Sequence, residues 1–206
     1  SLMATTFDAG AQPIVASPIA VDVDGTTPSG LDVSAGSIAL DVGTGRGFIA
    51  FTQDADATGS VRDRLYVRGF DLSRIGTATP VFYVTPVDMT VGGASAQTQA
   101  VLFEAGIGEQ GRGFLVHGEN LPGAAADTLT HLFCRPFEAE TFTFGSAQPA
   151  SRRMNFGDAV LTGEGVDAVK ILMSTDAPKA ILLHTVAQTD TGSSTTYRRL
   201  FANVQR

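Results

Sequence analysis

The sequence of 206 residues is poor in several residue types, and each shortage excludes a class of protein. It has a single cysteine, Cys134, so no disulfide can form within the chain, and its apolar neighbours predict a buried thiol. Lysine and arginine number 14 against 21 aspartates and glutamates, and they form no long basic run. This charge distribution argues against nucleic acid and against anionic lipid as partners.

Long hydrophobic and helical patterns are also missing. No apolar run reaches the roughly 20 residues that a membrane-spanning helix needs, so we expect no membrane partner. No segment repeats apolar residues at the 3.6-residue period of an amphipathic helix. The first residues, Ser1 to Ala4, lack a basic segment followed by an apolar core. We therefore expect no signal peptide, synthesis in the cytoplasm, and a final place in a virion or an extracellular assembly.

What the sequence does contain is short alternations of apolar and polar residues, separated by Gly, Pro, Asp, Ser and Thr. In residues 38–42, three aliphatic side chains alternate with Ala39 and Asp41, as in a half-buried strand. Residues 43–47 are rich in glycine and turn the chain, and residues 48–52 return it as a hairpin. We predict an all-β fold, an antiparallel β-sandwich or jelly roll with little or no helix.

The length suits one domain. Residues 1–13 are interpreted as a flexible N-terminal arm and residues 14–206 as a single β-sandwich domain. No linker, low-complexity tract or internal repeat is obvious. The predicted strands cover residues 14–23, 38–42, 48–52, 65–70, 81–84, 99–104, 114–117, 129–133, 141–144, 166–173, 179–186 and 196–204. The predicted core residues are Ile38, Leu40, Val42, Leu65, Val67, Ile171, Met173, Leu182, Val186 and Leu200.

One segment has the pattern of a calcium loop. Asp54, Asp56, Thr58 and Ser60 place oxygen ligands at alternate positions, and Gly59 would make the sharp turn. The twelfth position of such a loop is a leucine here instead of the bidentate glutamate, so other loops would have to complete the coordination. Polar residues of this kind also form ordinary turns. Calcium is the one cofactor that the sequence suggests.

A second candidate metal site combines His117, Glu119 and His184. Residues 117 and 119 share a face if they lie on a strand, and two histidines with one carboxylate are the ligand set of non-haem iron. The set is similar to that of cupins and 2-oxoglutarate oxygenases, which are jelly rolls. That resemblance implies that Arg198 or Arg199 anchors a substrate carboxylate. The alternative is that these histidines pack or form hydrogen bonds within the core.

Residues 38–47, IALDVGTGRG, and residues 67–73, VRGFDLS, resemble two motifs of class I S-adenosylmethionine methyltransferases. The resemblance implies a glycine-rich loop against the cofactor and an acidic residue on its ribose. The matching positions are Asp41, Gly43, Gly45, Gly47 and Asp71. Such a site requires a helix directly after the glycines. The residues that follow alternate instead of showing a helical stripe, which favours the hairpin.

No set of catalytic residues emerges from the sequence, and no Gly-x-Ser-x-Gly nucleophile motif is present. Carbohydrate-binding modules usually expose aromatic rings, whereas tryptophan is absent here and tyrosine occurs three times. We therefore expect a non-enzymatic structural or assembly module, such as a phage virion component or a surface appendage protein. Its partners would be its own copies or other structural proteins. The alternatives are a metal-dependent jelly-roll oxygenase, a carbohydrate-binding module and a methyltransferase.

Overall fold

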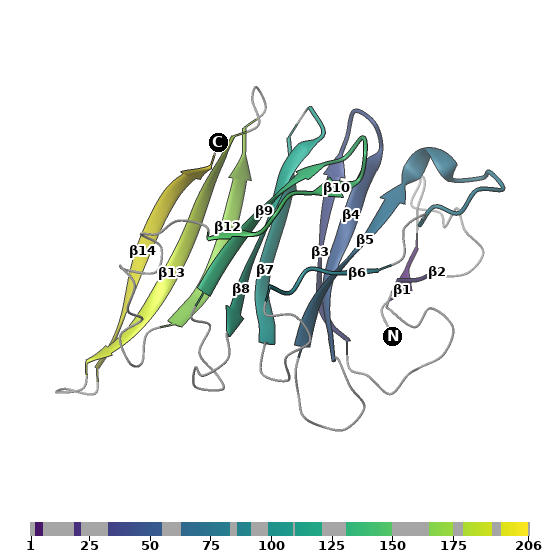
Figure 1. The fold of residues 1–206 in the computed structure, drawn as a ribbon. Helices are drawn as coiled ribbons and strands as arrows, with labels where there is room; N and C mark the ends of the chain where they lie inside the picture. Colours follow the sequence, from purple (N-terminus) through teal and green to yellow (C-terminus); the bar gives the residue numbers. More distant parts are fainter. Residues whose placement is uncertain are drawn as a thin grey trace.

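The fold is built almost entirely from strands (Figure 1). The computed structural model describes residues 3–5, 19–21, 33–54, 63–82, 86–91, 99–108, 110–120, 131–149, 165–174, 179–190 and 195–205. Within these ranges the one helical element is a 3-10 turn, η1 (Leu72–Arg74). No helix found there is long and apolar enough to cross a membrane.

Three antiparallel sheets follow one another along the chain, and a short strand pair precedes them. The first sheet has the order β3 (Val33–Asp41), β4 (Arg46–Asp54), β5 (Asp63–Asp71), β6 (Val87–Asp88). The second sheet consists of β7 (Gln99–Ile107), β8 (Arg112–Asn120), β9 (His131–Glu138) and, beside β9, the short β10 (Thr143–Phe144) and β11 (Gln148–Pro149). The third sheet consists of β12 (Gly165–Met173), β13 (Ala180–Asp190) and β14 (Thr195–Gln205). The preceding pair consists of β1 (Met3–Ala4) and β2 (Ile19–Ala20).

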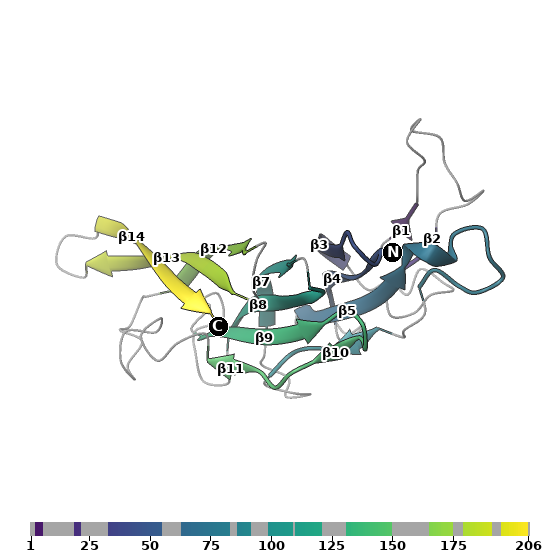
Figure 2. The same ribbon diagram turned by 90° about the horizontal axis from the view of Figure 1, so that it is seen from above.

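The predicted all-β antiparallel architecture is confirmed, and its sheets are stacked. The second sheet lies in the middle, because β7 packs against β3 on one side and β12 on the other (Figure 2). One apolar core, which includes Phe48 and Leu115, joins the first and second sheets. Another, which includes Phe114 and Leu182, joins the second and third sheets. Consecutive strands pair in a simple meander, so of the two predicted forms the chain adopts the sandwich.

The stack is an internal structural repeat, which the sequence analysis missed. The first strands of the three sheets begin at residues 33, 99 and 165, at a constant interval of 66 residues. Each carries a register shift one residue after its start, between Ser34 and Gly36, Ala100 and Leu102, and Val166 and Ala168. Gly45 and Gly111, also 66 residues apart, have φ angles of 70° and 69°. The sheets are therefore successive copies of one unit.

The same repeat is visible in the sequence once the strands are aligned. The sequence GRGF runs from the turn into the second strand at residues 45–48 and at residues 111–114, and PKAI occupies residues 178–181. The third strands contain LYVRGFD at residues 65–71 and LFCRPFE at residues 132–138. The pairings match as well, since Arg46 lies opposite Asp71 and Arg112 lies opposite Glu138. Equivalent positions can therefore be compared from sheet to sheet.

The predicted core is correct at some positions and wrong at others. Leu65, Val67 and Leu182 are fully buried, which confirms the prediction for them. Leu40, Ile171 and Met173 are partly buried beside the cores, and the side chain of Val186 lies outside the described residues. The prediction is wrong for three residues, whose side chains are 65%, 87% and 68% exposed: Ile38, Val42 and Leu200.

The errors at β3 arise from the choice of face. Alternation predicts that one side of residues 38–42 is buried, and the size of the aliphatic side chains favours the side of Ile38, Leu40 and Val42. The structure instead turns Ala39 into the core between the first two sheets, where Phe48 lies opposite it on β4. The space that Phe48 fills leaves room there only for a small side chain. Ile38 therefore points away from that core.

Candidate functional site

The glycine-rich segment of the methyltransferase resemblance is a β-hairpin. Asp41 ends β3, and its carboxylate accepts hydrogen bonds from the Gly43 amide at 3.0 Å and the Thr44 hydroxyl at 2.7 Å. Gly45 takes a left-handed φ and donates its amide to the Asp41 carbonyl at 2.8 Å. The next residues form β4 directly. The loop therefore presents no helix N-terminus to a cofactor, and its aspartate closes the turn.

Asp71 is the second acidic residue of the segments that resemble methyltransferase motifs. Its carboxylate is also bound by other groups of this chain. Burial alone would raise its pKa, but hydrogen bonds from the Ser73 hydroxyl and amide and the pairing with Arg46 outweigh this effect. The net result is a pKa below the usual aspartate value, because these groups stabilise the carboxylate. Arg46 reaches it at 3.2 Å and also donates to the Glu140 carbonyl of the second sheet at 3.1 Å. Arg46 thus links Asp71 to the turn that follows β9.

His117 and Glu119 do share a face of β8, as the sequence predicts. Both are fully buried, and His117 Nε2 lies 2.8 Å from Glu119 Oε1. The same carboxylate oxygen accepts the Val91 amide at 2.6 Å. The His117 ring packs beside Phe133 on β9 at a centroid separation of 5.6 Å. This is a buried polar pair between the first two sheets, on the side of β8 to which Leu115 also points.

Arg135 supplies positive charge to this region. Its guanidinium donates to the Met89 carbonyl at 2.9 Å. Burial lowers the pKa of Arg135, and the carboxylates of Glu119 and Asp88 partly offset that effect by stabilising the cation. Arginine stays protonated despite such a shift, so the buried glutamate has a permanent cationic neighbour. The arrangement ties the segment at Met89 to the second sheet.

The predicted iron ligands are not all brought together. His184 on β13 is buried on the face of Leu182, which packs against the side of the second sheet that bears Phe114. His117 and Glu119 point to the opposite side of that sheet, so the sheet itself separates them from His184. Among the described residues no three His, Cys, Asp or Glu side chains form a group that could hold a metal ion.

The predicted calcium ligands lie outside the described residues. Asp56, Thr58 and Ser60 fall in the range 55–62, and of Asp54 only the backbone at the end of β4 is described. The cysteine prediction can be checked and is confirmed, since Cys134 is 4% exposed. Burial raises the pKa of its thiol to about 12, so it is not a nucleophile at neutral pH.

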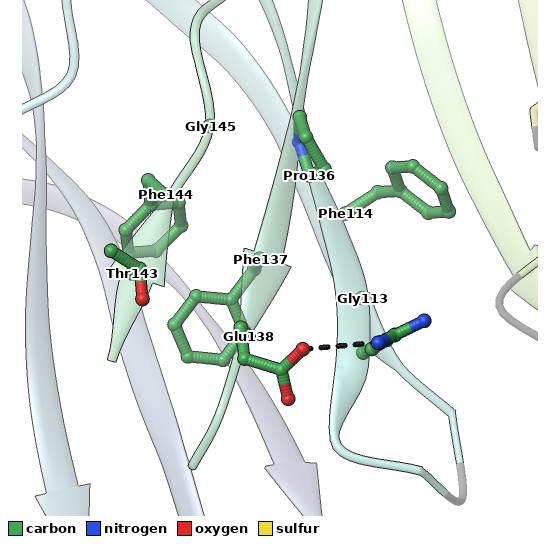
Figure 3. Close-up of a pocket in the computed structure, with 9 residues that line it drawn as sticks. Gly113, Phe114, Pro136, Phe137, Glu138, Thr143, Phe144 and Gly145 are labelled. Carbon is green, nitrogen blue, oxygen red and sulfur yellow. Dashed lines mark hydrogen bonds and ion pairs between the residues drawn. The ribbon is translucent and has the colours of Figure 1, made fainter. Parts of the chain in front are cut away.

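A surface cleft of about 430 Å³ lies on the second sheet, where β8, β9 and β10 meet (Figure 3). Its walls are largely apolar, with Phe114 on one side and Phe144 on the other, and Pro136 lies between them. Glu138 is its one carboxylate and accepts a hydrogen bond from Arg112 at 3.1 Å. The charged groups of the cleft are therefore already paired with each other.

The repeat explains why this cleft is open. Gly69 in the first sheet is equivalent to Pro136 in the second, because Phe48 lies opposite the glycine and Phe114 opposite the proline. The Phe142 ring lies over Gly69 so closely that a methyl group there would collide with it. Over Pro136 the corresponding space is the cleft. The cleft thus lies on the second sheet alone, and the residues that line it include no reactive pair.

The third sheet has an apolar outer face, on the side away from the second sheet. Four side chains of three strands make it up and are exposed by 60%, 44%, 68% and 63%: Leu172, Ile181, Leu200 and Val204. Three of these form one row across the sheet, because Leu172 pairs with Ile181 and Ile181 pairs with Val204. We call these four residues the outer face. Exposed apolar side chains gathered on one face of a sheet favour an interaction site.

Sequence reasoning missed this surface because it treated Leu200 as a core residue. The signal that could have found it is the repeat. Leu200 is equivalent to Leu65 and Leu132, each of which is buried beneath the next sheet. Aligning the three segments shows that the last one needs a covering layer as well. The alternating pattern alone shows only that one side of β14 is apolar.

Comparisons with known proteins do not assign this chain to a family. No protein-family model and no curated protein matches the chain. Solved structures that resemble it include a thermostable family-43 glycoside hydrolase, at 14% identity and a TM-score of 0.44, and an exo-1,5-alpha-L-arabinanase from a bovine ruminal metagenomic library, at 10% and 0.43. The matches cover 88% and 91% of this chain but 56% and 59% of those chains. The chain thus spans just over half the length of these two enzymes, and at such TM-scores the likeness assigns no activity.

Proposed function

We propose that this chain is a non-enzymatic structural module that assembles with other protein subunits, in a body such as a virion or a surface appendage. The observation that carries the proposal is the apolar outer face of the third sheet, defined by Leu172, Ile181, Leu200 and Val204. In a stacked repeat, an apolar sheet face is stable only when another layer covers it. Here the third sheet exposes apolar side chains on its outer side, which favours their burial against further protein.

The polar groups inside the stack support the same conclusion. Glu119 accepts hydrogen bonds from His117 and from the Val91 amide, and Asp71 accepts them from Ser73 and Arg46. The contacts with Val91 and Arg46 join segments that are far apart in the sequence. A catalytic carboxylate or histidine must instead be within reach of a substrate. Glu119 and His117 are fully buried and so do not meet that condition in this conformation.

The test is the state of association of the full chain. Sedimentation velocity over a wide concentration range is expected to show oligomers, and Leu200→Glu is expected to shift them to monomer, since a buried charge without a partner is costly. Ile38→Glu is the matched control, because Ile38 is 65% exposed but lies on the first sheet. A strict monomer at every concentration would contradict the proposal. So would equal effects of the two substitutions.

A further inference from the structure

The third strand of each of the first two sheets is paired on both of its sides. β5 pairs with β4 and also with β6, and β9 pairs with β8 and also with β10 and β11. The third strand of the third sheet is β14, which pairs with β13 over all eleven of its residues without a register shift (Figure 1). On its other side, which we call the β14 edge, no strand of the described residues pairs with it. A long and regular edge of this kind is a template for pairing with a further strand.

The added strands of the first two sheets pair with equivalent residues. β6 pairs antiparallel with Tyr66 and Val67. β11 pairs antiparallel with Phe133 and Cys134, which occupy the same two positions of the repeat. The segments that lead to β6 and β11 differ in sequence and in length. The third strand of the repeat therefore has a fixed docking position for an added strand.

A second point of pairing is shared as well. Phe70 forms an antiparallel bridge with Phe82 in the first sheet, and its equivalent Phe137 pairs with Phe144 in the second. In both sheets one segment thus runs antiparallel along the same stretch of the third strand. The equivalent stretch of β14 is residues 201–205.

The charges beside this stretch indicate which kind of strand fits. Arg64 lies just before the docking position in the first sheet, and it pairs with Asp88 of β6 at 2.8 Å. Arg199 occupies the same position of the repeat in β14. In the second sheet this position is His131, and the docked strand carries Pro149 where β6 has its aspartate. The arginine is therefore present where the docked strand brings a carboxylate.

We propose that the β14 edge binds a short acidic strand of another protein, antiparallel to residues 201–205, with a carboxylate that pairs with Arg199. The inference rests on the proposed function and names the segment that a partner supplies. Main-chain hydrogen bonds hold a strand that is added to a sheet edge, and side chains set its specificity. β14 contains two arginines and no acidic residue, so the β14 strand of a second copy would bring no carboxylate to the edge.

The backbone of the repeat has the direction that such pairing needs. The Met89 amide, next to β6, donates to the Leu65 carbonyl at 2.7 Å. Leu65 thus points its carbonyl toward the added strand, and so does the residue two positions later, because main-chain groups alternate along a strand. The equivalent residues of β14 are Leu200 and Ala202. Their main-chain groups are therefore expected to point away from β13.

A short peptide serves as the probe. It has blocked ends and the sequence of residues 84–91, VTPVDMTV, which includes β6. Titrated into the isotope-labelled full chain, it is expected to shift the amide resonances of residues 200–205. Methylation of the Met89 nitrogen removes a main-chain donor of the peptide and is expected to abolish binding. A peptide with Asp88→Asn is expected to bind up to about fivefold more weakly, since it lacks an exposed ion pair.

Charge reversal in the chain tests the chemistry of the partner. Arg199→Glu is expected to weaken binding of the peptide about tenfold, because a favourable pair is replaced by a repulsive one. A peptide with Asp88→Lys is expected to recover most of this loss. Arg198→Glu is the matched control, since the adjacent residue lies on the other side of the strand, and it is expected to change binding by less than about twofold.

A backbone variant tests the edge itself. Ala202→Pro removes a main-chain donor of the β14 edge and is expected to abolish binding, while a proline at an edge leaves the pairing with β13 intact. Circular dichroism checks that each variant keeps its strands. If Ala202→Pro loses them, the peptide methylated at Met89 provides the same test of main-chain pairing.

The outcomes separate this inference from the proposed function. Absence of peptide binding at millimolar concentration overturns the inference. Binding that folded Ala202→Pro or the methylated peptide leaves unchanged also overturns it, because the peptide then lies elsewhere on the molecule. Binding that depends on the edge but responds equally to Arg199→Glu and Arg198→Glu overturns the acidic partner. Oligomers of the wild-type chain test the proposed function alone, and they persist if only this inference fails.

Discussion

Gly45 and Gly111 occupy the same place in two successive sheets, each with a left-handed φ near 70° and each followed by Arg-Gly-Phe. Both end the turn between the first and second strands of their sheet. Residues with a side chain rarely adopt this conformation, so the two glycines set where the hairpins close. Because hairpin closure fixes register, the same glycine also fixes which side chains each sheet buries.

Replacing Gly45 by alanine is therefore expected to destabilise the fold by about 1–2 kcal/mol, through left-handed strain. Gly43→Ala in the same turn is the control, because its φ is not left-handed and the added methyl would meet Asp41 Oδ1 at an ordinary 3.4 Å. That change is expected to stay within about 0.5 kcal/mol of wild type. Urea unfolding followed by circular dichroism measures both. Equal losses would mean that strain at Gly45 is not the cause.

Removing the charge of Glu119 is expected to destabilise the fold, because the Arg135 cation then loses a carboxylate that stabilises it at a half-buried place. Glu119→Gln keeps an oxygen for the Val91 amide and so isolates the charge effect. The control is Glu138→Gln, whose partner Arg112 is 59% exposed, with an expected cost of about 0–1 kcal/mol. Denaturant unfolding at neutral pH compares them. A loss for Glu119→Gln no larger than the control contradicts this assignment.

Cys134 is expected to resist thiol reagents in the folded protein. Its pKa of about 12 means that thiolate forms only at strongly alkaline pH, and burial blocks the reagent. Since this pKa is raised above the usual value of a thiol, the stabilising effect of the neutral thiol is fully present below that usual value and is lost as pH rises toward 12. Labelling with a disulfide reagent at pH 8, with and without urea, tests the first statement. Rapid labelling of the folded chain would contradict it.

Leu182 and Leu200 should respond very differently to truncation, although the sequence predicts both as core. Leu182 is fully buried between the second and third sheets, so Leu182→Ala is expected to cost about 2–5 kcal/mol. Leu200 is 68% exposed, so Leu200→Ala is expected to change monomer stability by no more than about 0.5 kcal/mol. Unfolding at low protein concentration avoids any contribution from association. A large loss for Leu200→Ala at that concentration would show that the outer face is buried within the monomer.

Strand positions and the turn at residues 42–45 could be predicted because they depend on local properties: alternation with period two and a glycine that permits a left-handed φ. The contact between His117 and Glu119 could also be predicted, since residues two apart on a strand share a face. The separation of His184 from that pair could not be predicted from the sequence. It depends on which side of the second sheet each residue faces, and alternation leaves that side undetermined.

By itself, the sequence determined that this chain forms extended strands joined by tight turns, because its apolar residues recur every second position and its glycines and aspartates allow the backbone to reverse. Only the tertiary structure decided which face of each strand is inside. Ala39 is buried and Ile38 is not because Phe48 occupies the space between the first two sheets. The apolar row at Ile181 is exposed for a related reason. A face of a strand is buried only where another sheet packs against it, and the strand's own sequence does not decide this.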